Sequence, residues 1–195
     1  MKYRWEIINW LIQKRGYKRY LEVGVKDGYC YDRVSCKQKV GIDIDLKTKA
    51  TGTIEISSDD FFAVDNGLFD IIFIDGDHRE AQVDLDIKNA VMHLVSDGTI
   101  VMHDCNPKKA IYATPERGQD QPLWSGTAYR SFIKIRKQGY LSACVVDIDW
   151  GCGIVQVGEP DIVSVPNNYT WADFDANRKE WLDLITVEEF KRRFK

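Results

Sequence analysis

The chain has 195 residues, of which 44% are hydrophobic, 12% aromatic and 29% charged. This composition argues against a disordered chain, and the length suits one domain with a small appendage. No apolar run approaches the roughly 20 residues that cross a bilayer, and the first residues lack the pattern of a signal peptide. The five cysteines are scattered without a CxxC pair, which argues against a disulfide framework or a zinc site. We therefore expect a cytoplasmic enzyme or binding domain without a membrane partner.

The net charge of −3 is unevenly distributed along the chain. Residues 1–20 contain six basic residues and one acidic residue, and four of the five residues 191–195 are basic. Residues 41–90 contain twelve acidic residues and four basic ones. An acidic middle segment argues against a nucleic-acid groove there, because phosphate binding requires the opposite charge. We interpret the basic ends as solvated helix faces, with contact to an anionic partner as the alternative.

Short runs rich in isoleucine and valine alternate with helical segments in the first half of the chain. These runs predict five strands, at residues 20–25, 40–44, 53–56, 69–74 and 98–102. The runs are nearly continuous in apolar residues, as strands buried on both faces of a parallel sheet are. Apolar residues at helical spacing predict a helix from about 80 to 95. This order predicts an α/β protein with a Rossmann-like, doubly wound and mostly parallel sheet.

The order changes after residue 102. Residues 104–126 predict a long loop, and residues 127–138 predict a helix. Two strands, at 141–146 and 153–157, are close enough to form a C-terminal antiparallel hairpin. We therefore expect a Rossmann-like domain over residues 1–158.

Residues 159–195 predict a helical C-terminal extension. Thr170 and Thr186 are each followed three residues later by an acidic residue, which is typical of a capping box at a helix start. We expect apolar side chains to pack this extension on the domain, with a partner-binding surface as the alternative. These side chains are Trp171, Phe174, Trp181 and Leu182.

Small and acidic residues follow the first three strands, at the edge where α/β sheets bind ligands. Gly24 and Gly28 allow a sharp turn and a close approach to a ligand, but they do not form the GxGxxG motif of nicotinamide oxidoreductases. Asp43 is placed to accept hydrogen bonds from ribose hydroxyls. Ser58 could cap a short helix, and Asp59 could accept from an adenine amino group or simply be a helix-start charge. A glycine turn followed about 15 residues later by a strand-end acid predicts an adenosine-binding site.

Four segments carry motifs in a fixed order. They are Glu-x-Gly-x-x-x-Gly-Tyr-Cys at 22–30, Gly-Ile-Asp at 41–43, Phe-Ile-Asp-Gly-Asp-His at 73–78 and Gly-Thr-Ile-Val-Met-His-Asp at 98–104. Over about residues 19–104 the chain resembles class I S-adenosylmethionine-dependent methyltransferases of the small O-methyltransferase-like branch. Beyond residue 105, Trp-Ser-Gly-Thr at 124–127 and Asp-Ile-Asp-Trp-Gly-Cys-Gly at 147–153 resemble only a bacterial and phage subgroup of unassigned activity.

The resemblance implies S-adenosylmethionine as the cofactor. Its expected binding residues are Glu22, Gly24, Lys26, Gly28, Asp43, Ile44, Ser58, Asp59 and Asp75. Lys26 departs from the glycine of many such enzymes. Its side chain could meet the methionine carboxylate of the cofactor, or it could point to water.

Asp75 and Asp104 follow two strands that we expect to be neighbours, roughly 4.8 Å apart. Two carboxylates so close repel each other unless they share a proton or hold a cation, and oxygen ligands suit Mg²⁺, Ca²⁺ or Mn²⁺. The resemblance implies such a metal site, because the corresponding pair in catechol-type O-methyltransferases binds a divalent cation. The next residue is Cys105, a poor magnesium ligand, and Asn106 could substitute for it.

His78 and His103 follow the same two strands and are candidates for a general base, with a structural histidine as the alternative. We favour His103, which is adjacent to Asp104, whereas His78 could line the cofactor. The nearest cations along the chain, Arg79 and Lys108, could replace the metal, and His103 would then carry the proton alone.

The sequence thus predicts an S-adenosylmethionine-dependent O-methyltransferase that acts on a small-molecule or sugar-like hydroxyl, with His103, Asp104 and His78 as catalytic residues. The alternative is a non-catalytic S-adenosylmethionine-binding protein of the same fold, which would need few of these acids and histidines. Trp124 and Tyr129 could stack on cofactor or acceptor, although aromatic side chains more often pack in cores. We expect no nucleic-acid partner, and the chain could form a homo-oligomer.

Overall fold

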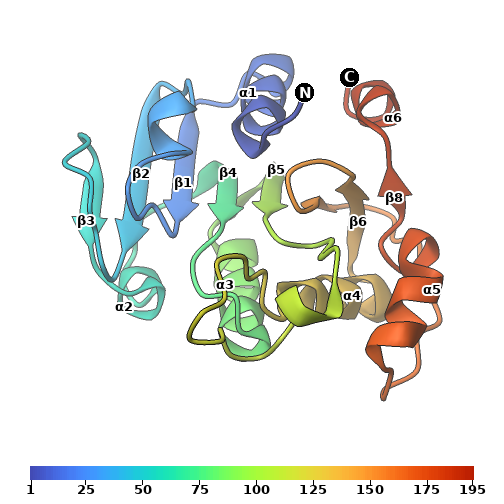
Figure 1. The fold of residues 1–195 in the computed structure, drawn as a ribbon. Coiled ribbons are helices and arrows are strands. Elements are labelled where there is room, and N and C mark those ends of the chain that lie inside the picture. Colours follow the sequence, from blue (N-terminus) through green and yellow to red (C-terminus); the bar gives the residue numbers. More distant parts are fainter.

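The computed structural model describes residues 1–195 as an eight-stranded sheet covered by helices (Figure 1). The strands are β1 Arg19–Val23, β2 Gln38–Asp43, β3 Thr53–Glu55, β4 Phe69–Ile74, β5 Leu94–Met102, β6 Leu141–Val146, β7 Cys152–Val157 and β8 Leu184–Ile185. The helices are α1 Arg4–Arg15, α2 Ser58–Phe62, α3 Glu80–Met92, α4 Ala128–Gln138, α5 Trp171–Trp181 and α6 Val187–Arg193, with 3-10 turns η1 Tyr31–Arg33 and η2 Ala110–Tyr112. None of the helices combines the length and the apolar character that a membrane span requires.

The strand order in the sheet is β3-β2-β1-β4-β5-β7-β6-β8. Every pair of neighbours is parallel except those of β7, which is antiparallel to both β5 and β6. The chain places β2 and β3 on one side of β1 and then crosses to β4 on the other side. This creates a switch point between β1 and β4, where sheets of this kind bind ligands. The prediction of a Rossmann-like, mostly parallel sheet with an antiparallel C-terminal hairpin is confirmed.

The boundary between α3 and β5 differs from the prediction. The helix ends at Met92 and the strand begins at Leu94, so residues 94–97 belong to the strand and not to a helix that reaches 95. The pairing of β5 with β4 shifts register between Phe69 and Ile71. At this irregularity a Cβ on Gly98 would lie 2.6 Å from Leu94 Cγ, so the strand bends through a position that only glycine can occupy.

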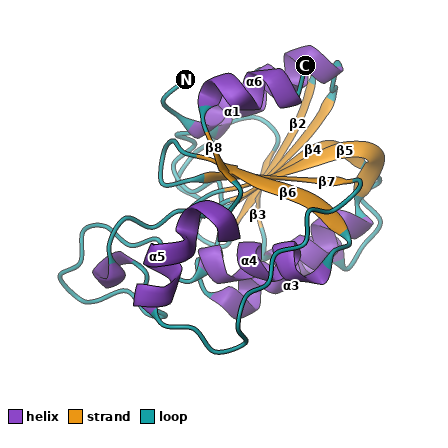
Figure 2. Ribbon diagram, turned by 90° about the vertical axis from the view of Figure 1, so that its right-hand side faces the viewer, coloured by secondary structure: helices purple, strands orange, loops and turns teal.

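Helices cover both faces of the sheet (Figure 2). The side that carries α3, α4 and α5 contains one core, and α1 and α6 cover the opposite side. Along β4 the side chains alternate, because Ile72 and Ile74 belong to the first core, whereas Ile71 and Phe73 face α1 and α6. We name this second core the α1–α6 core; its helical members include Ile7, Ile8, Leu11 and Phe190.

The C-terminal segment is part of the sheet as well as of the helical layers. Phe174, Trp181 and Leu182 are buried in the first core, and Trp171 is packed against it. The segment is not purely helical as expected, because β8 pairs in parallel with β6. Thr170 forms the predicted reciprocal capping box of α5.

Candidate active site

A cavity of about 1070 Å³ lies beyond the carboxyl ends of β1, β2, β4 and β5. Its position is the switch point of the sheet. Nearly all residues expected to bind a cofactor line it: Glu22, Gly24, Lys26, Asp43, Ile44, Ser58, Asp59 and Asp75. Gly28 does not line the cavity, contrary to expectation. Its backbone has φ +84°, so it shapes the turn while buried beneath it.

The loop after β1 is fixed against its neighbours by close backbone contacts. A Cβ on Gly24 would lie 2.3 Å from the carbonyl oxygen of Asp75, so only glycine lets the ends of β1 and β4 approach this closely. Asp43 accepts hydrogen bonds from the backbone N–H of Lys26 and of Asp45, each at 2.8 Å. The carboxylate of Asp43 is therefore oriented at the cavity wall, and its oxygens retain lone pairs for a ligand.

The third strand leads to α2, whose first residues form the far end of the cavity. The helix is capped by Ser57, whose hydroxyl accepts the N–H of Asp60 at 3.0 Å, so the expectation that Ser58 caps it is wrong. Ser58 instead donates to buried Asp86 at 2.6 Å. Asp59 lies on the same wall and accepts a hydrogen bond from Gln82 at 3.2 Å.

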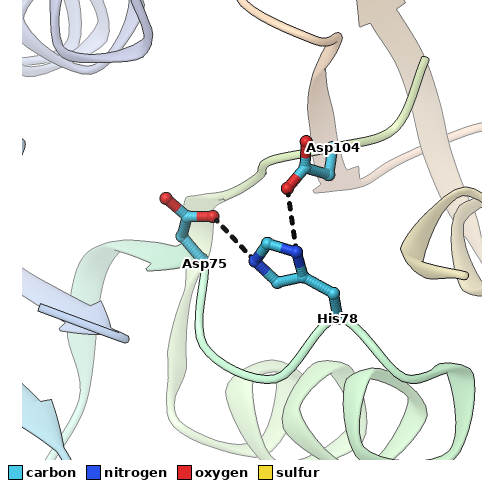
Figure 3. A group of neighbouring side chains, drawn as sticks. All are labelled: Asp75, His78 and Asp104. Carbon is cyan, nitrogen blue, oxygen red and sulfur yellow. Dashed lines mark ion pairs between the residues drawn. The ribbon is translucent and has the colours of Figure 1, made fainter. Parts of the chain in front are cut away.

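Asp75, His78 and Asp104 lie close together, and all three line the cavity (Figure 3). Asp75 follows β4, Asp104 follows β5, and His78 lies in the loop before α3. The His78 ring lies between the two carboxylates, with Nε2 3.6 Å from Asp75 Oδ1 and Nδ1 3.2 Å from Asp104 Oδ2. One donor atom from each of the three residues lies within 4.8 Å of the others. The other side of the His78 ring stacks on Trp124, at 5.2 Å between centroids.

A second group adjoins the first and contains residues that the sequence did not indicate. His103 places Nδ1 3.1 Å from Asp75 Oδ1 and 3.4 Å from Asp104 Oδ2. Its Nε2 lies 3.2 Å from Arg4 Nη1 and 3.7 Å from Asp149 Oδ1. Arg4, the first residue of α1, places Nε 3.4 Å from Asp75 Oδ2 and donates from Nη1 to Asp149 Oδ2 at 3.1 Å.

The positive charge beside Asp75 comes from Arg4, and not from Arg79 or Lys108 as expected. Neither of the two expected cations reaches the acids: Arg79 pairs with Asp77, and Lys108 with Asp147. The charge comes from the other end of the chain, through a contact that no local pattern reveals. Asp149 lies in the segment that resembles the bacterial and phage subgroup, but its role was not expected.

Two further expectations about the site are wrong. Asn106 does not substitute as a metal ligand, because it is fully buried outside the cavity, where it donates to Asp147 at 2.9 Å and accepts from Arg178. Tyr129 does not stack on a ligand, because it is buried in the first core, 4.5 Å from Phe174 between centroids. Trp124 does line the cavity.

The buried charges shift the pKa values of the histidines upward. Burial by itself lowers the pKa of His103, but the charges of Asp75 and Asp104 outweigh it and hold the pKa well above the ordinary value. Burial also opposes the charged form of His78, whose pKa is raised by its contacts with the same two carboxylates. Burial disfavours the carboxylate form of Asp75, yet the charge and hydrogen bond of His103 lower its pKa below the ordinary range.

The charge of the whole group follows from these contacts. The group contains three carboxylates, those of Asp75, Asp104 and Asp149, and one guanidinium, that of Arg4, which pairs with Asp75 and Asp149. Two negative charges therefore remain when both histidines are neutral. Two imidazolium protons balance them, and so would one divalent cation. The site is therefore built to hold positive charge in one of these two forms.

Strained backbone is concentrated around the cavity. Five non-glycine residues have positive φ, and four of them line it: Lys26, Asp104, Asp149 and Trp150. Such conformations cost about 1–3 kcal/mol each and persist only where the surrounding structure imposes them. The strain thus marks the same location as the charged group.

Solved methyltransferase structures share this fold. The S-adenosylhomocysteine-bound methyltransferase PaMTH1 from Podospora anserina is 15% identical over 82% of this chain and 80% of its own, with a TM-score of 0.58. The O-methyltransferase from Bacillus cereus, in complex with S-adenosylhomocysteine, is 15% identical over 80% of each chain, with a TM-score of 0.55. The MycE methyltransferase of the mycinamycin pathway, in complex with Mg, S-adenosylhomocysteine and mycinamycin VI, is 19% identical over 80% of this chain and 49% of its own, with a TM-score of 0.50.

Residues 21–105 match a protein family described as a methyltransferase domain. Over this segment, which is less than half of its length, the chain is similar to class I methyltransferases, and it shares their fold. The matched segment contains the glycine turn, Asp43 and the Asp75–His78–Asp104 group, whereas Arg4 and Asp149 lie outside it. No curated protein matches the chain at a significant level.

Proposed function

We propose that the protein is an S-adenosylmethionine-dependent methyltransferase that methylates a hydroxyl group of a small or sugar-like molecule. The observation that carries the proposal is the sharing of one cavity by two sets of residues. The set at Asp43, Ser58 and Asp59 suits adenosine, and the group Asp75, His78 and Asp104 suits the handling of a hydroxyl proton. A protein that only binds the cofactor would need the first set alone.

The residues present fit the cofactor. Asp43 offers a fixed carboxylate to the ribose hydroxyls, and the wall at Ser58 and Asp59 offers polar acceptors to the adenine. A cavity of about 1070 Å³ is at the upper end of the range for small-molecule sites, so it can hold a cofactor together with a small acceptor. S-adenosylmethionine supplies an electrophilic methyl group when it is bound.

The contribution of the chain to methyl transfer is positioning and proton removal. An in-line displacement needs the two reactants held in one geometry, and a hydroxyl acceptor also needs a base. We assign the base to His78, in place of the expected His103. Both rings contact charged groups through both nitrogens, but the His78 side chain is 21% exposed, whereas that of His103 is 7% exposed. His103 then serves as a fixed positive charge between the carboxylates.

The residues also fit a divalent cation. Asp75 and Asp104 offer carboxylate oxygens to it, and a cation there would balance the two negative charges of the group. Held at this place, a cation such as Mg²⁺ would lower the pKa of an acceptor hydroxyl. The fold likeness to MycE, which was solved with Mg, supports this part of the proposal.

Calorimetry with S-adenosylhomocysteine and, separately, NADH tests the proposal. We expect S-adenosylhomocysteine to bind with micromolar affinity, about 8 kcal/mol, and NADH not to bind. Binding of NADH without binding of S-adenosylhomocysteine would contradict the proposal. Turnover of S-adenosylmethionine with a panel of sugars and phenols then distinguishes an enzyme from a protein that only binds the cofactor.

A further inference from the structure

We propose that Arg4, the first residue of the N-terminal helix α1, binds the methionyl carboxylate of the cofactor. The inference rests on the proposed function and deepens it. It assigns a binding role to a residue outside the matched segment 21–105, where neither the motifs nor the family match indicates one.

The strand order separates Arg4 from the residues that we assign to adenosine. Ser58 and Asp59 follow β3 and Asp43 ends β2, whereas Arg4 contacts Asp75, which follows β4 on the other side of β1. The amino-acid part of the cofactor must extend in the other direction, past Gly24. In that direction the wall contains Tyr29, whose ring centroid lies 5.8 Å from the guanidinium carbon of Arg4.

The guanidinium of Arg4 has one nitrogen without a partner in the chain. Its Nη1 is engaged with Asp149 and His103. Its Nε is buried and faces Asp75 Oδ2 at 3.4 Å, where it forms an ion pair but no hydrogen bond. No hydrogen bond from Nη2 occurs within the chain, so Nη2 is the donor that a ligand carboxylate can use.

The charges around Arg4 suit the zwitterionic end of an amino acid. Asp75 lines the same cavity as Arg4 and offers a carboxylate to an α-ammonium group. A guanidinium beside a carboxylate thus complements an ammonium beside a carboxylate.

Lys26 is the rival for this role, because the sequence alone left open a contact between its side chain and the carboxylate. Its backbone N–H binds Asp43, which places it at the ribose, and its side chain is exposed without a hydrogen bond or ion pair in the chain. Arg4 is held on two sides and is therefore the better organised of the two cations for binding.

The test compares S-adenosylmethionine with decarboxylated S-adenosylmethionine, which lacks only the carboxylate, by calorimetry. We expect the wild-type protein to bind the carboxylate-bearing ligand about 10–100-fold more tightly, as one charge-assisted hydrogen bond implies. In Arg4→Gln this preference falls to about threefold or less, while the affinity for the decarboxylated ligand changes little. The control Arg33→Gln keeps the preference, because Arg33 contacts Trp5 and Tyr29 but does not line the cavity.

Equal binding of the two ligands by the wild-type protein would overturn the inference, and so would loss of the preference in Lys26→Ala but not in Arg4→Gln. If Arg4→Gln does not fold by circular dichroism, the wild-type preference and its retention in Lys26→Ala decide the matter. Failure of both ligands to bind would contradict the proposed function itself. The failure of the inference and the failure of the proposed function are thus distinguishable.

Discussion

Asp75 connects the two charged groups of the cavity. It contacts His78, His103 and Arg4. A substitution of Asp75 would therefore disturb the proposed base His78 and the proposed carboxylate-binding residue Arg4 at the same time. Asp104 contacts only the two histidines among charged side chains. Substitution of Asp104 is therefore the cleaner probe of the metal, and Asp43 is the cleaner probe of the cofactor.

Replacement of Asp43 tests the ribose contact. We expect Asp43→Ala to weaken S-adenosylhomocysteine binding by about 1–3 kcal/mol, because the ribose hydroxyls lose a charged acceptor. The fold should persist, since Asp43 is half-buried at an open cavity wall. Calorimetry measures the change, and Glu55→Ala, at an exposed carboxylate of β3 that does not line the cavity, is the matched control. Unchanged affinity in Asp43→Ala would mean that the ribose lies elsewhere.

Replacement of Asp104 tests the cation. With S-adenosylhomocysteine bound, we expect the wild-type protein to bind Mg²⁺ or Mn²⁺, and Asp104→Asn to bind it at least about tenfold more weakly, because one anionic ligand is lost. Asp147→Asn is the control, since Asp147 pairs with Lys108 outside the cavity. Absence of metal affinity in the wild type, or full turnover in the presence of a chelator, would leave proton transfer to histidine alone.

The packing of α5 indicates that the C-terminal segment unfolds together with the domain and is not an independent extension. Phe174 is fully buried against the first core and contacts Tyr129 of α4. We expect Phe174→Ala to lower the free energy of unfolding of the whole protein by about 3–5 kcal/mol in a single urea transition. Tyr140→Ala, at a side chain that is 78% exposed, should change it little. Two separate transitions in the wild type would show that residues 159–195 unfold independently.

How well each element could be predicted depends on the range of its contacts. β1, β2 and β4 contain short runs rich in apolar residues, and parallel strands bring the carboxyl ends of such runs to one edge of the sheet, so the place where they meet could be predicted. α1 buries Ile7, Ile8 and Leu11. The sequence did not indicate this, because we interpreted the basic residues of the segment as a solvated helix face. β8 has only two residues, too few for a periodic pattern, and is defined by its pairing with β6.

The same reasoning applies to the site. The sequence identified four candidate residues because each follows a strand: Asp75, His78, His103 and Asp104. The sequence could not show which histidine acts as the base, because that depends on the exposure and contacts of each ring in the folded chain. Arg4 and Asp149 meet across 145 positions of sequence, and only the folded sheet brings them together.

At the scale of the whole molecule, the cofactor should stabilise the fold by mass action. A ligand at about 100 times its dissociation constant adds about 2.7 kcal/mol, which for a chain of this size raises the melting temperature by roughly 5–10 °C. We expect this shift with S-adenosylhomocysteine in differential scanning fluorimetry. Asp43→Ala should show a smaller shift at the same ligand concentration, and an equal shift in both proteins would argue against binding at the predicted cavity.

The α1–α6 core has a consequence for the order in which the protein can be made. Its helical members come from both ends of the chain, Ile7, Ile8 and Leu11 from α1 and Phe190 from α6. During synthesis, the apolar face of the sheet beneath α6 stays uncovered until residue 190 has been added. A nascent chain with exposed apolar surface is prone to aggregation. A nascent chain of this protein should therefore be prone to aggregation until α6 can dock on the sheet.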